Sequence, residues 1–208
     1  MKKYLLSVAL SALVATPAAA ANLTGPRLEG RIGWDKLTLD ASYDDGEEVI
    51  EGSDSDEGVS LGGELGFDLQ VSQNLLVGGY AGADFSSVNQ CEEVFGNDSA
   101  CLKFDRNLYL GARGGFVTGK ALLYVKGGYS RGRIKASYDD GVELTSGSAN
   151  RDGFHLGAGV EIGLSDRSYV KAEYVRTNYD DYGASDEGLD VGIDTHRDQI
   201  VLGVGLRF

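Results

Sequence analysis

Apolar and polar residues alternate with a period of two along eight segments of the chain, and this pattern constrains the fold more than any other feature. Successive side chains of a β-strand point to opposite sides, so strict alternation predicts strands with one apolar and one polar face. The last proline is Pro26, and every backbone N–H beyond it can therefore join a hydrogen-bonded ladder. The alternating segments are residues 28–35, 59–70, 75–85, 104–116, 123–130, 154–164, 170–174 and 199–208.

The connections between these segments are short and long in turn. Short turns, such as 71–74 and 165–168, follow the second, fourth and sixth segments, whereas longer acidic stretches follow the others. An even number of strands, with short turns at one end and long loops at the other, is typical of outer-membrane barrels. The sequence therefore predicts an all-β fold, an eight-stranded antiparallel transmembrane up-and-down β-barrel, with its short turns in the periplasm.

Alternation alone does not say which face points outward, because a soluble barrel of the lipocalin kind would enclose the apolar set around a ligand. Here the polar set consists mainly of glycines and of side chains of opposite charge. The interior of an eight-stranded barrel is just wide enough for its own side chains, and an unpaired buried charge is strongly destabilising. We therefore expect the apolar face to contact lipid and the charges to pair across the lumen. The predicted lumen charge network consists of Arg31, Glu64, Asp68, Arg113, Lys126, Glu161, Lys171 and Glu173.

Residues 1–21 have the features of a secretory signal peptide. A basic start at Lys2 and Lys3 is followed by a mainly apolar stretch, residues 4–14, which is too short to span a bilayer. Small residues then precede the expected cleavage site. The sequence thus predicts an exported protein whose barrel domain comprises residues 22–208.

Cys91 and Cys101 are the only cysteines of the chain, and they enclose a polar stretch without histidine. Disulfides are stable in the oxidising compartments that exported proteins reach. A metal site would need further ligands nearby. We therefore expect a loop disulfide between Cys91 and Cys101, rather than a metal site.

The chain is strongly acidic, with a formal net charge of -13. This balance argues against nucleic-acid binding, which depends on basic contacts to phosphate. Acidic residues are densest between residues 44 and 57, where carboxylates could hold Ca²⁺ or Mg²⁺. The residue spacing does not match an EF-hand loop, so we expect a solvated acidic surface and no metal site. The weak metal candidates are Asp44, Asp45, Asp54 and Asp56.

Support for catalysis is slight. His155 and His196 are the only histidines, and His155 falls in the inward set of its strand. Ser60 occupies the equivalent position 95 residues earlier, which makes a serine–histidine pair conceivable. The chain contains no P-loop, dinucleotide-binding fingerprint or zinc-ligand pattern. We expect no enzymatic activity and no cofactor.

A repeated pattern indicates that the predicted barrel consists of two duplicated halves of four strands, and the alternative is that membrane strands converged on one pattern. The hexapeptide at residues 41–46 is identical to that at 136–141, an offset of 95. In both copies the apolar phase changes at the same place, near residues 35–36 and 130–131. An extra residue in the strand would cause this change, so the sequence predicts a β-bulge at each position.

Three segments give the chain a family resemblance: residues 123–129, 169–174 and 202–208. With the other features they resemble the small outer-membrane β-barrel family, the OmpA-like and opacity-type porin family proteins of Gram-negative bacteria. The resemblance implies an integral protein of the cell outer membrane. It also implies that Phe208, after alternating apolar residues, is the signal read by the outer-membrane assembly machinery.

These features predict a non-enzymatic barrel with a structural or surface-interaction role in the cell envelope. The expected partners are outer-membrane lipid and lipopolysaccharide, the assembly machinery and an extracellular ligand bound through the acidic loops. Since the lumen is expected to be filled, little or no conductance should result. The alternatives are a narrow porin-like pore for small solutes and a lipid-A-modifying barrel enzyme that uses His155 or His196.

Overall fold

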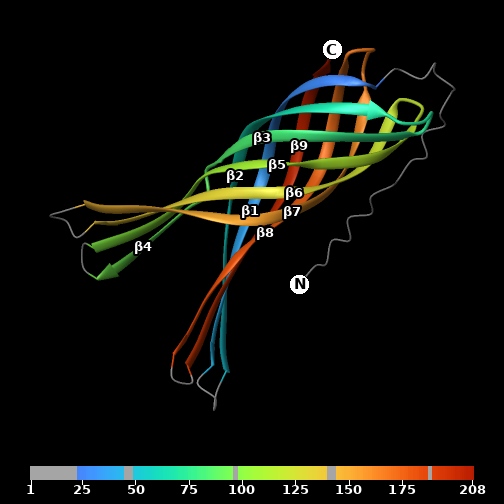
Figure 1. Cartoon of the computed structure of the whole chain (residues 1–208). Helices are drawn as coiled ribbons and strands as arrows, with labels where there is room; N and C mark the ends of the chain where they lie inside the picture. The colour runs from blue at the N-terminus through green and yellow to red at the C-terminus, as the bar shows by residue number, and fades with distance from the viewer. Residues whose placement is uncertain (1–22, 45–48, 96–97, 140–143, 187–188) are drawn as a thin grey trace, which may run out of the picture.

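The computed structural model describes residues 23–44, 49–95, 98–139, 144–186 and 189–208, and the predicted signal peptide lies outside these ranges (Figure 1). Within the described residues, no helix is long and apolar enough to cross a membrane. The strands are β1 (Gly25–Asp44), β2 (Val49–Gln70), β3 (Leu75–Ser86), β4 (Asn89–Phe95), β5 (Asp98–Thr118), β6 (Ala121–Asp139), β7 (Leu144–Gly163), β8 (Ser168–Asp186) and β9 (Leu189–Arg207).

Eight of these strands form a closed antiparallel ring. Strands that follow one another in the chain pair from β1 to β3 and from β5 to β9. The β1–β9 and β3–β5 ladders join these two runs into a ring, while β4 pairs with the outer part of β5. The predicted eight-stranded antiparallel barrel is therefore confirmed.

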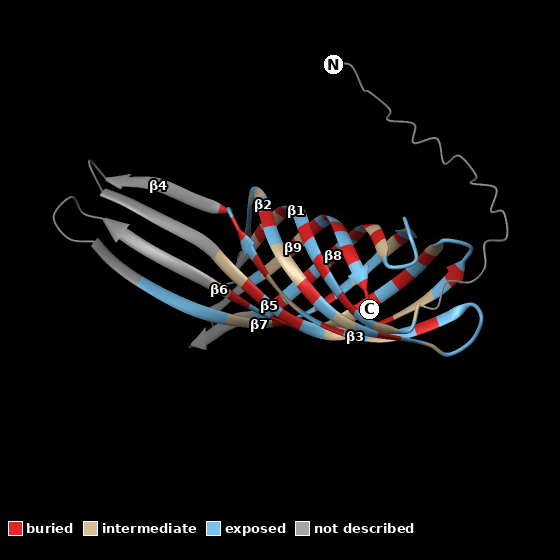
Figure 2. Ribbon diagram, turned by 90° about the horizontal axis from the view of Figure 1, so that it is seen from above, coloured by how far each residue is buried: buried red, intermediate tan, exposed pale blue. Residues whose placement is uncertain are grey.

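Burial alternates along the strands of the ring (Figure 2), and large apolar side chains stand at the exposed positions. Leu65, Val125 and Leu156 are 62%, 64% and 72% exposed, respectively. The polar residues between such side chains are buried inside the ring. A small buried apolar cluster lies near the short turns and consists of Leu76, Val117, Leu122 and Tyr124.

Much of the sequence that we expected to form long acidic loops forms extended β-hairpins instead. The β1–β2 ladder continues to the pair Asp44–Val49, and the β8–β9 ladder continues to Asp186–Leu189. These hairpins project well beyond the ring (Figure 1). Paired strands satisfy each other's backbone hydrogen-bonding groups, which is why acidic side chains do not prevent the extension.

The wall of the barrel separates at two seams where it leaves the ring. The β2–β3 ladder ends at Ser60–Ser86, and the β7–β8 ladder ends at Gly153–Tyr179. Two four-stranded blades result, and they diverge in Figure 1. The first blade contains the outer parts of β2, β1, β9 and β8, and the second contains β4 and the outer parts of β5, β6 and β7.

The bulges predicted near residues 35–36 and 130–131 do not occur. The β1–β2 and β6–β7 ladders pass both positions without a register shift, so this prediction was wrong. Leu37 instead packs against the buried side chains of Val88 and Tyr179. In β1, the change of apolar phase thus accompanies an apolar contact at the outer rim.

Candidate functional site in the barrel lumen

The inward face of the ring carries a dense set of charged side chains. Every second residue of a strand points to this face. Among the described residues, the buried charges are seven cations and seven anions, so the formal charges inside the ring cancel. The cations are Arg27, Arg31, Arg113, Lys126, Lys171, Arg197 and Arg207, and the anions are Glu29, Asp35, Glu64, Asp68, Asp84, Glu161 and Glu173.

The layer of charges nearest the short turns is centred on Asp68 of β2. Its carboxylate accepts hydrogen bonds from Arg113 Nε at 2.9 Å and from Arg113 Nη2 at 2.5 Å, a bidentate contact. Arg113 Nη1 also lies 3.4 Å from Glu161 Oε2, and Arg207 donates a hydrogen bond to the other oxygen of Glu161. This layer therefore connects β2, β5, β7 and β9 across the lumen.

The middle layer is centred on Glu64. Its carboxylate accepts hydrogen bonds from Arg27 Nη2 at 2.6 Å, Lys126 Nζ at 2.8 Å and Arg31 Nη1 at 3.4 Å. Lys126 Nζ also donates to Glu173 Oε1 at 3.3 Å. These five side chains are at most 4% exposed. Because each charge has partners of the opposite sign, the cost of removing it from water is offset.

The outer layer is centred on Asp35 of β1. Its two carboxylate oxygens accept hydrogen bonds from Ser60 Oγ at 3.0 Å, Ser86 Oγ at 2.7 Å and Gln199 Nε2 at 2.8 Å. Arg197 also donates a hydrogen bond to this carboxylate. Asp35 therefore joins β1, β2, β3 and β9 on one side of the lumen, where the two blades begin to separate.

Glycines on the inward face make room for tyrosine rings. A Cβ atom at Gly205 would lie 2.1 Å from Cζ of Tyr169, and one at Gly82 would lie 2.3 Å from the hydroxyl of Tyr109. The hydroxyl of Tyr169 donates a hydrogen bond to Glu29 at 3.0 Å. The rings thus fill the lumen and contribute to its polar network.

His155 lies inside the lumen, but its serine neighbour is not the one considered from the sequence. Its Nε2 lies 2.6 Å from the hydroxyl of Tyr80, and its Nδ1 lies 3.0 Å from Ser130 Oγ. Ser60 is bound to Asp35 instead. The hypothesis of a pair formed by Ser60 and His155 is therefore wrong.

His196 lies on the outer part of β9, away from His155. Its Nδ1 lies 3.4 Å from Asp40 Oδ2, and its Nε2 lies 3.9 Å from Asp198 Oδ2. All three side chains are partly exposed. This histidine belongs to the acidic surface of the first blade.

The lumen holds little free volume between its charged layers. A cavity of about 10 Å³ lies beside His155 and Ser130, which is room for about one water molecule. A larger cavity of about 290 Å³ opens at the end with the short turns, and it reaches Glu161 and Arg207. Its other lining residues include Val117, Lys120, Leu164, Ser168 and Tyr169.

The structure brings together all eight residues of the charge network proposed from the sequence. Each is buried, and each forms at least one ion pair inside the ring. Sequence reasoning left six further charges out of the network, although four of them lie at polar positions inside the alternating segments and extending the alternation by one or two residues would have found the other two. The six are Arg27, Glu29, Asp35, Asp84, Arg197 and Arg207.

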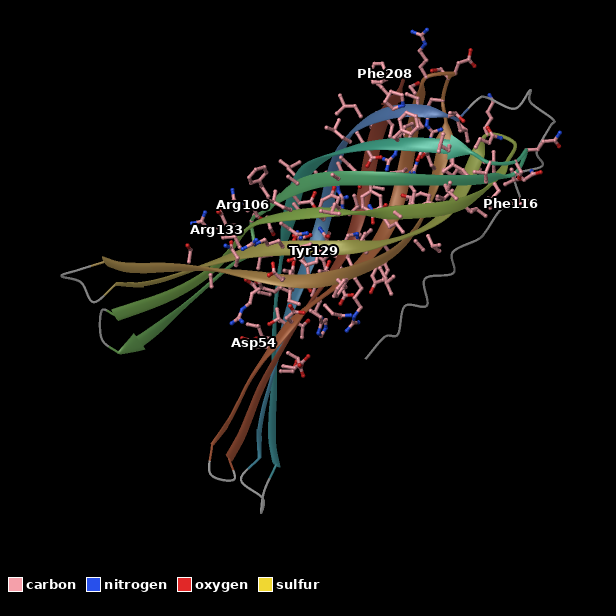
Figure 3. All side chains as sticks on the ribbon, viewed as in Figure 1. Asp54, Arg106, Phe116, Tyr129, Arg133 and Phe208 are labelled. Carbon is pink, nitrogen blue, oxygen red and sulfur yellow. The ribbon has the colours of Figure 1, made fainter. Side chains whose placement is uncertain are left out.

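The weak metal candidates do not converge where they are described. Asp54 Oδ1 accepts a hydrogen bond from the backbone N–H of Ser55 at 2.8 Å, and Asp56 Oδ1 accepts one from Glu57 at 2.9 Å. Asp54 lies on β2, beyond the ring (Figure 3). In the described part of the chain, no group of three or more His, Cys, Asp or Glu could hold a metal ion. The side chains of Asp44 and Asp45 lie outside the described residues.

Phe208 lies at the same end of the barrel as the short turns (Figure 3). This residue is 71% exposed, and its backbone N–H donates a hydrogen bond to the carbonyl oxygen of Pro26 at 3.0 Å. The role of Phe208 as an assembly signal stays a prediction.

The two cysteines face each other in the β4–β5 ladder, where Cys91 is the direct partner of Cys101. Their side chains lie outside the described residues. Directly opposed residues in antiparallel strands have Cα atoms about 4.5–5.5 Å apart, a separation that a disulfide spans. We predict that the denatured, unreduced protein adds no maleimide, whereas the reduced protein adds two. A Cys101→Ser variant should add one without reduction, and labelling of the unreduced wild type would contradict the disulfide.

Comparison with known proteins places the ring in a family. A family model for an outer membrane protein beta-barrel domain matches residues 6–208, and no curated protein matches the chain. The solved structures similar to it include the outer membrane protease OmpT from Escherichia coli, at 10% identity and a TM-score of 0.52, covering 95% of this chain and 99% of that one.

Two further solved structures are similar at lower TM-scores. Ail, the attachment invasion locus protein of Yersinia pestis, is 17% identical, with a TM-score of 0.42 over 86% of this chain and 99% of that one. Neisserial surface protein A is 15% identical, with a TM-score of 0.47 over 85% and 97%. The family model covers nearly the whole described barrel, so the chain belongs to the outer membrane protein beta-barrel domain family and is an integral outer-membrane protein.

Proposed function

We propose that this chain is a sealed, non-conducting barrel that serves the cell envelope through its wall and its two outer blades. The observation that carries the proposal is the neutral lumen, in which seven buried cations and seven buried anions are packed together. A permeating ion would have to replace contacts in all three charged layers. The blades, by contrast, present long hairpins outside the ring and supply the surface for interaction.

The narrow pore is the alternative within the same family, and the lumen geometry argues against it. The Asp68, Glu64 and Asp35 layers follow one another along the lumen, and the cavity between the middle and outer layers has a volume of only about 10 Å³. The cavity of about 290 Å³ opens beside Lys120 in a short turn, at one end of the ring. We therefore propose that water enters this mouth without crossing the barrel.

The same packing supports the proposal that the protein is not an enzyme. His155 is held between Tyr80 and Ser130 inside the ring, where the adjacent cavity has no room for a lipid or a peptide. His196 lies among the carboxylates of Asp40 and Asp198.

The partners that we propose for this barrel are outer-membrane lipid, lipopolysaccharide, the assembly machinery and an extracellular ligand.

Planar-bilayer recording tests the sealed lumen. Protein whose insertion is verified by heat-modifiable gel migration should give no stable conductance steps above those of the bare bilayer. The physical reason is that the ion pairs around Glu64 and Asp68 occupy the space that hydrated ions would need.

Two variants decide the meaning of any current that is observed. Lys126→Gln changes the middle layer of the lumen, whereas Glu57→Gln changes an exposed position on the outer part of β2. Stable openings whose size changes with Lys126→Gln, but not with Glu57→Gln, would identify a pore and contradict the proposal. Current that neither variant changes would be leakage around the protein.

A further inference from the structure

Two arginines lie directly opposite each other at the outer end of the barrel wall. The β5–β6 ladder pairs Arg106 with Arg133, next to a register shift between Phe104 and Arg106. Figure 3 shows both side chains together where β5 and β6 leave the ring. Arg131 precedes Arg133 by two residues and shares its face, because alternate residues of a strand point to the same side. Like charges directly opposite each other destabilise a ladder, so this face favours an anionic partner.

The protein neutralises this face only in part. Arg131 Nε lies 3.5 Å from Asp152 Oδ1, and the two side chains are 54% and 41% exposed. Arg133 Nη2 donates a hydrogen bond to Ser148 Oγ at 2.9 Å, but a hydroxyl carries no charge. Among the described residues, no carboxylate forms an ion pair with Arg106 or Arg133. Within the described part of this wall, the charges of Arg106 and Arg133 therefore have no anionic partner, although the chain as a whole is acidic.

The arginines lie at the edge of the apolar band. Leu108 is the direct ladder partner of Arg131, and its side chain is 45% exposed on the outside of the ring. Tyr129, two residues before Arg131, packs edge-on against Phe154 with ring centroids 6.1 Å apart. Aromatic girdles mark the membrane–water interface of transmembrane barrels. The three arginines are therefore at the height of the lipid headgroups on the outer side.

We propose that Arg106, Arg131 and Arg133 form a binding site for the phosphate groups of lipid A in the outer leaflet. Arginine binds phosphate oxygens through parallel N–H donors, which makes it well suited to such a headgroup. The acyl chains of the same lipid would lie against the exposed apolar residues below, such as Leu108 and Phe154. This inference assigns a ligand to the wall of the barrel, and its outcome is independent of whether the lumen conducts.

Binding of lipid A to the folded full-length barrel in neutral detergent micelles tests the site. The variant Arg106→Gln/Arg133→Gln removes both unpaired charges, while Lys120→Gln/Arg167→Gln removes two exposed charges from the short turns at the other end. Each basic side chain near anionic headgroups strengthens binding about fivefold, so the first variant should bind lipid A about 25-fold more weakly. The second variant should bind like the wild type. Native mass spectrometry measures the bound fraction directly.

Further arms of the experiment identify the ligand group and its source. Lipid A without phosphates should bind as weakly to the wild type as intact lipid A binds to the glutamine variant. Inorganic pyrophosphate should compete only poorly, because it lacks the acyl chains. Unchanged lipid A binding by a correctly folded glutamine variant would overturn the proposal, as would equally tight binding of pyrophosphate. If the double variant fails to fold, Arg133→Gln alone should still weaken binding about fivefold.

Discussion

Replacing Glu64 with glutamine is expected to lower the free energy of unfolding by about 3–5 kcal/mol, the cost of removing one partner from a buried ion pair. Glu64 accepts hydrogen bonds from Arg27, Lys126 and Arg31, so its neutralisation leaves a surplus positive charge inside the ring. Glutamine has nearly the same shape, and the effect should therefore be electrostatic. Urea unfolding in phospholipid vesicles, followed by the fluorescence of Trp34, measures the change.

Two further variants show whether the loss comes from the buried charge. Glu57→Gln makes the same chemical change on the exposed outer part of β2 and should alter stability by no more than about 0.5 kcal/mol. Adding Lys126→Met to Glu64→Gln removes the surplus cation and should restore part of the loss. If the Glu64→Gln barrel were as stable as the Glu57→Gln barrel, the prediction would fail. Water, rather than the ion pairs, would then stabilise the carboxylate of Glu64.

Replacing Gly205 with valine is expected to lower the free energy of unfolding by about 1–3 kcal/mol, because overpacking forces neighbouring side chains out of their positions. A Cβ atom at this position would lie 2.1 Å from Cζ of Tyr169. The ring would have to leave Gly205, and its hydroxyl would lose the hydrogen bond to Glu29. The same unfolding measurement in vesicles reports the loss.

Gly30 provides the matched control for this substitution. It lies on the exposed side of β1, and a Cβ atom there would have no heavy atom within 4 Å. Gly30→Val should therefore be close to neutral, or slightly stabilising, because valine favours a strand. Combining Gly205→Val with Tyr169→Ala should cost less than the sum of the two single changes. Strict additivity would show that the glycine does not accommodate the ring.

The ring could be predicted from the sequence because its strands obey one repeated rule. An inward residue must be small or paired with an opposite charge, and an outward residue must be apolar. The residue pattern therefore identifies each strand and also shows which of its two sides points into the lumen. The same rule is sufficient to place Glu64 and Arg113 inside the lumen. The family model confirms the outer-membrane barrel.

The partners inside the lumen could not be predicted in the same way. Arg113 forms its bidentate contact with Asp68, which is 45 residues away in the chain. Which inward side chains meet depends on the stagger of neighbouring strands, and alternation carries no information about stagger. For the same reason, alternation could not indicate that Ser60 would donate a hydrogen bond to Asp35 rather than meet His155.

The internal repeat shows how far a sequence offset can be trusted. Trp34 pairs with Val59, and 95 residues later Tyr129 pairs with Phe154, so the register of β1–β2 recurs in β6–β7. The offset fails in the next hairpin. Leu65 pairs with Ala81, but Val160, which lies 95 residues after Leu65, pairs with Ala172 and not with the residue 95 positions after Ala81. Turn geometry sets the register of each hairpin, and the short turns of the two halves differ.

The cancellation of charge inside the ring has a consequence for how the molecule responds to electrolyte. Because the interior sums to zero, the whole net charge of -13 is carried by other parts of the chain. Mobile ions screen exposed charges far more than enclosed ones. Added salt should therefore change how neighbouring molecules approach the acidic hairpins. The same salt should leave the stability of the membrane-spanning wall nearly unchanged.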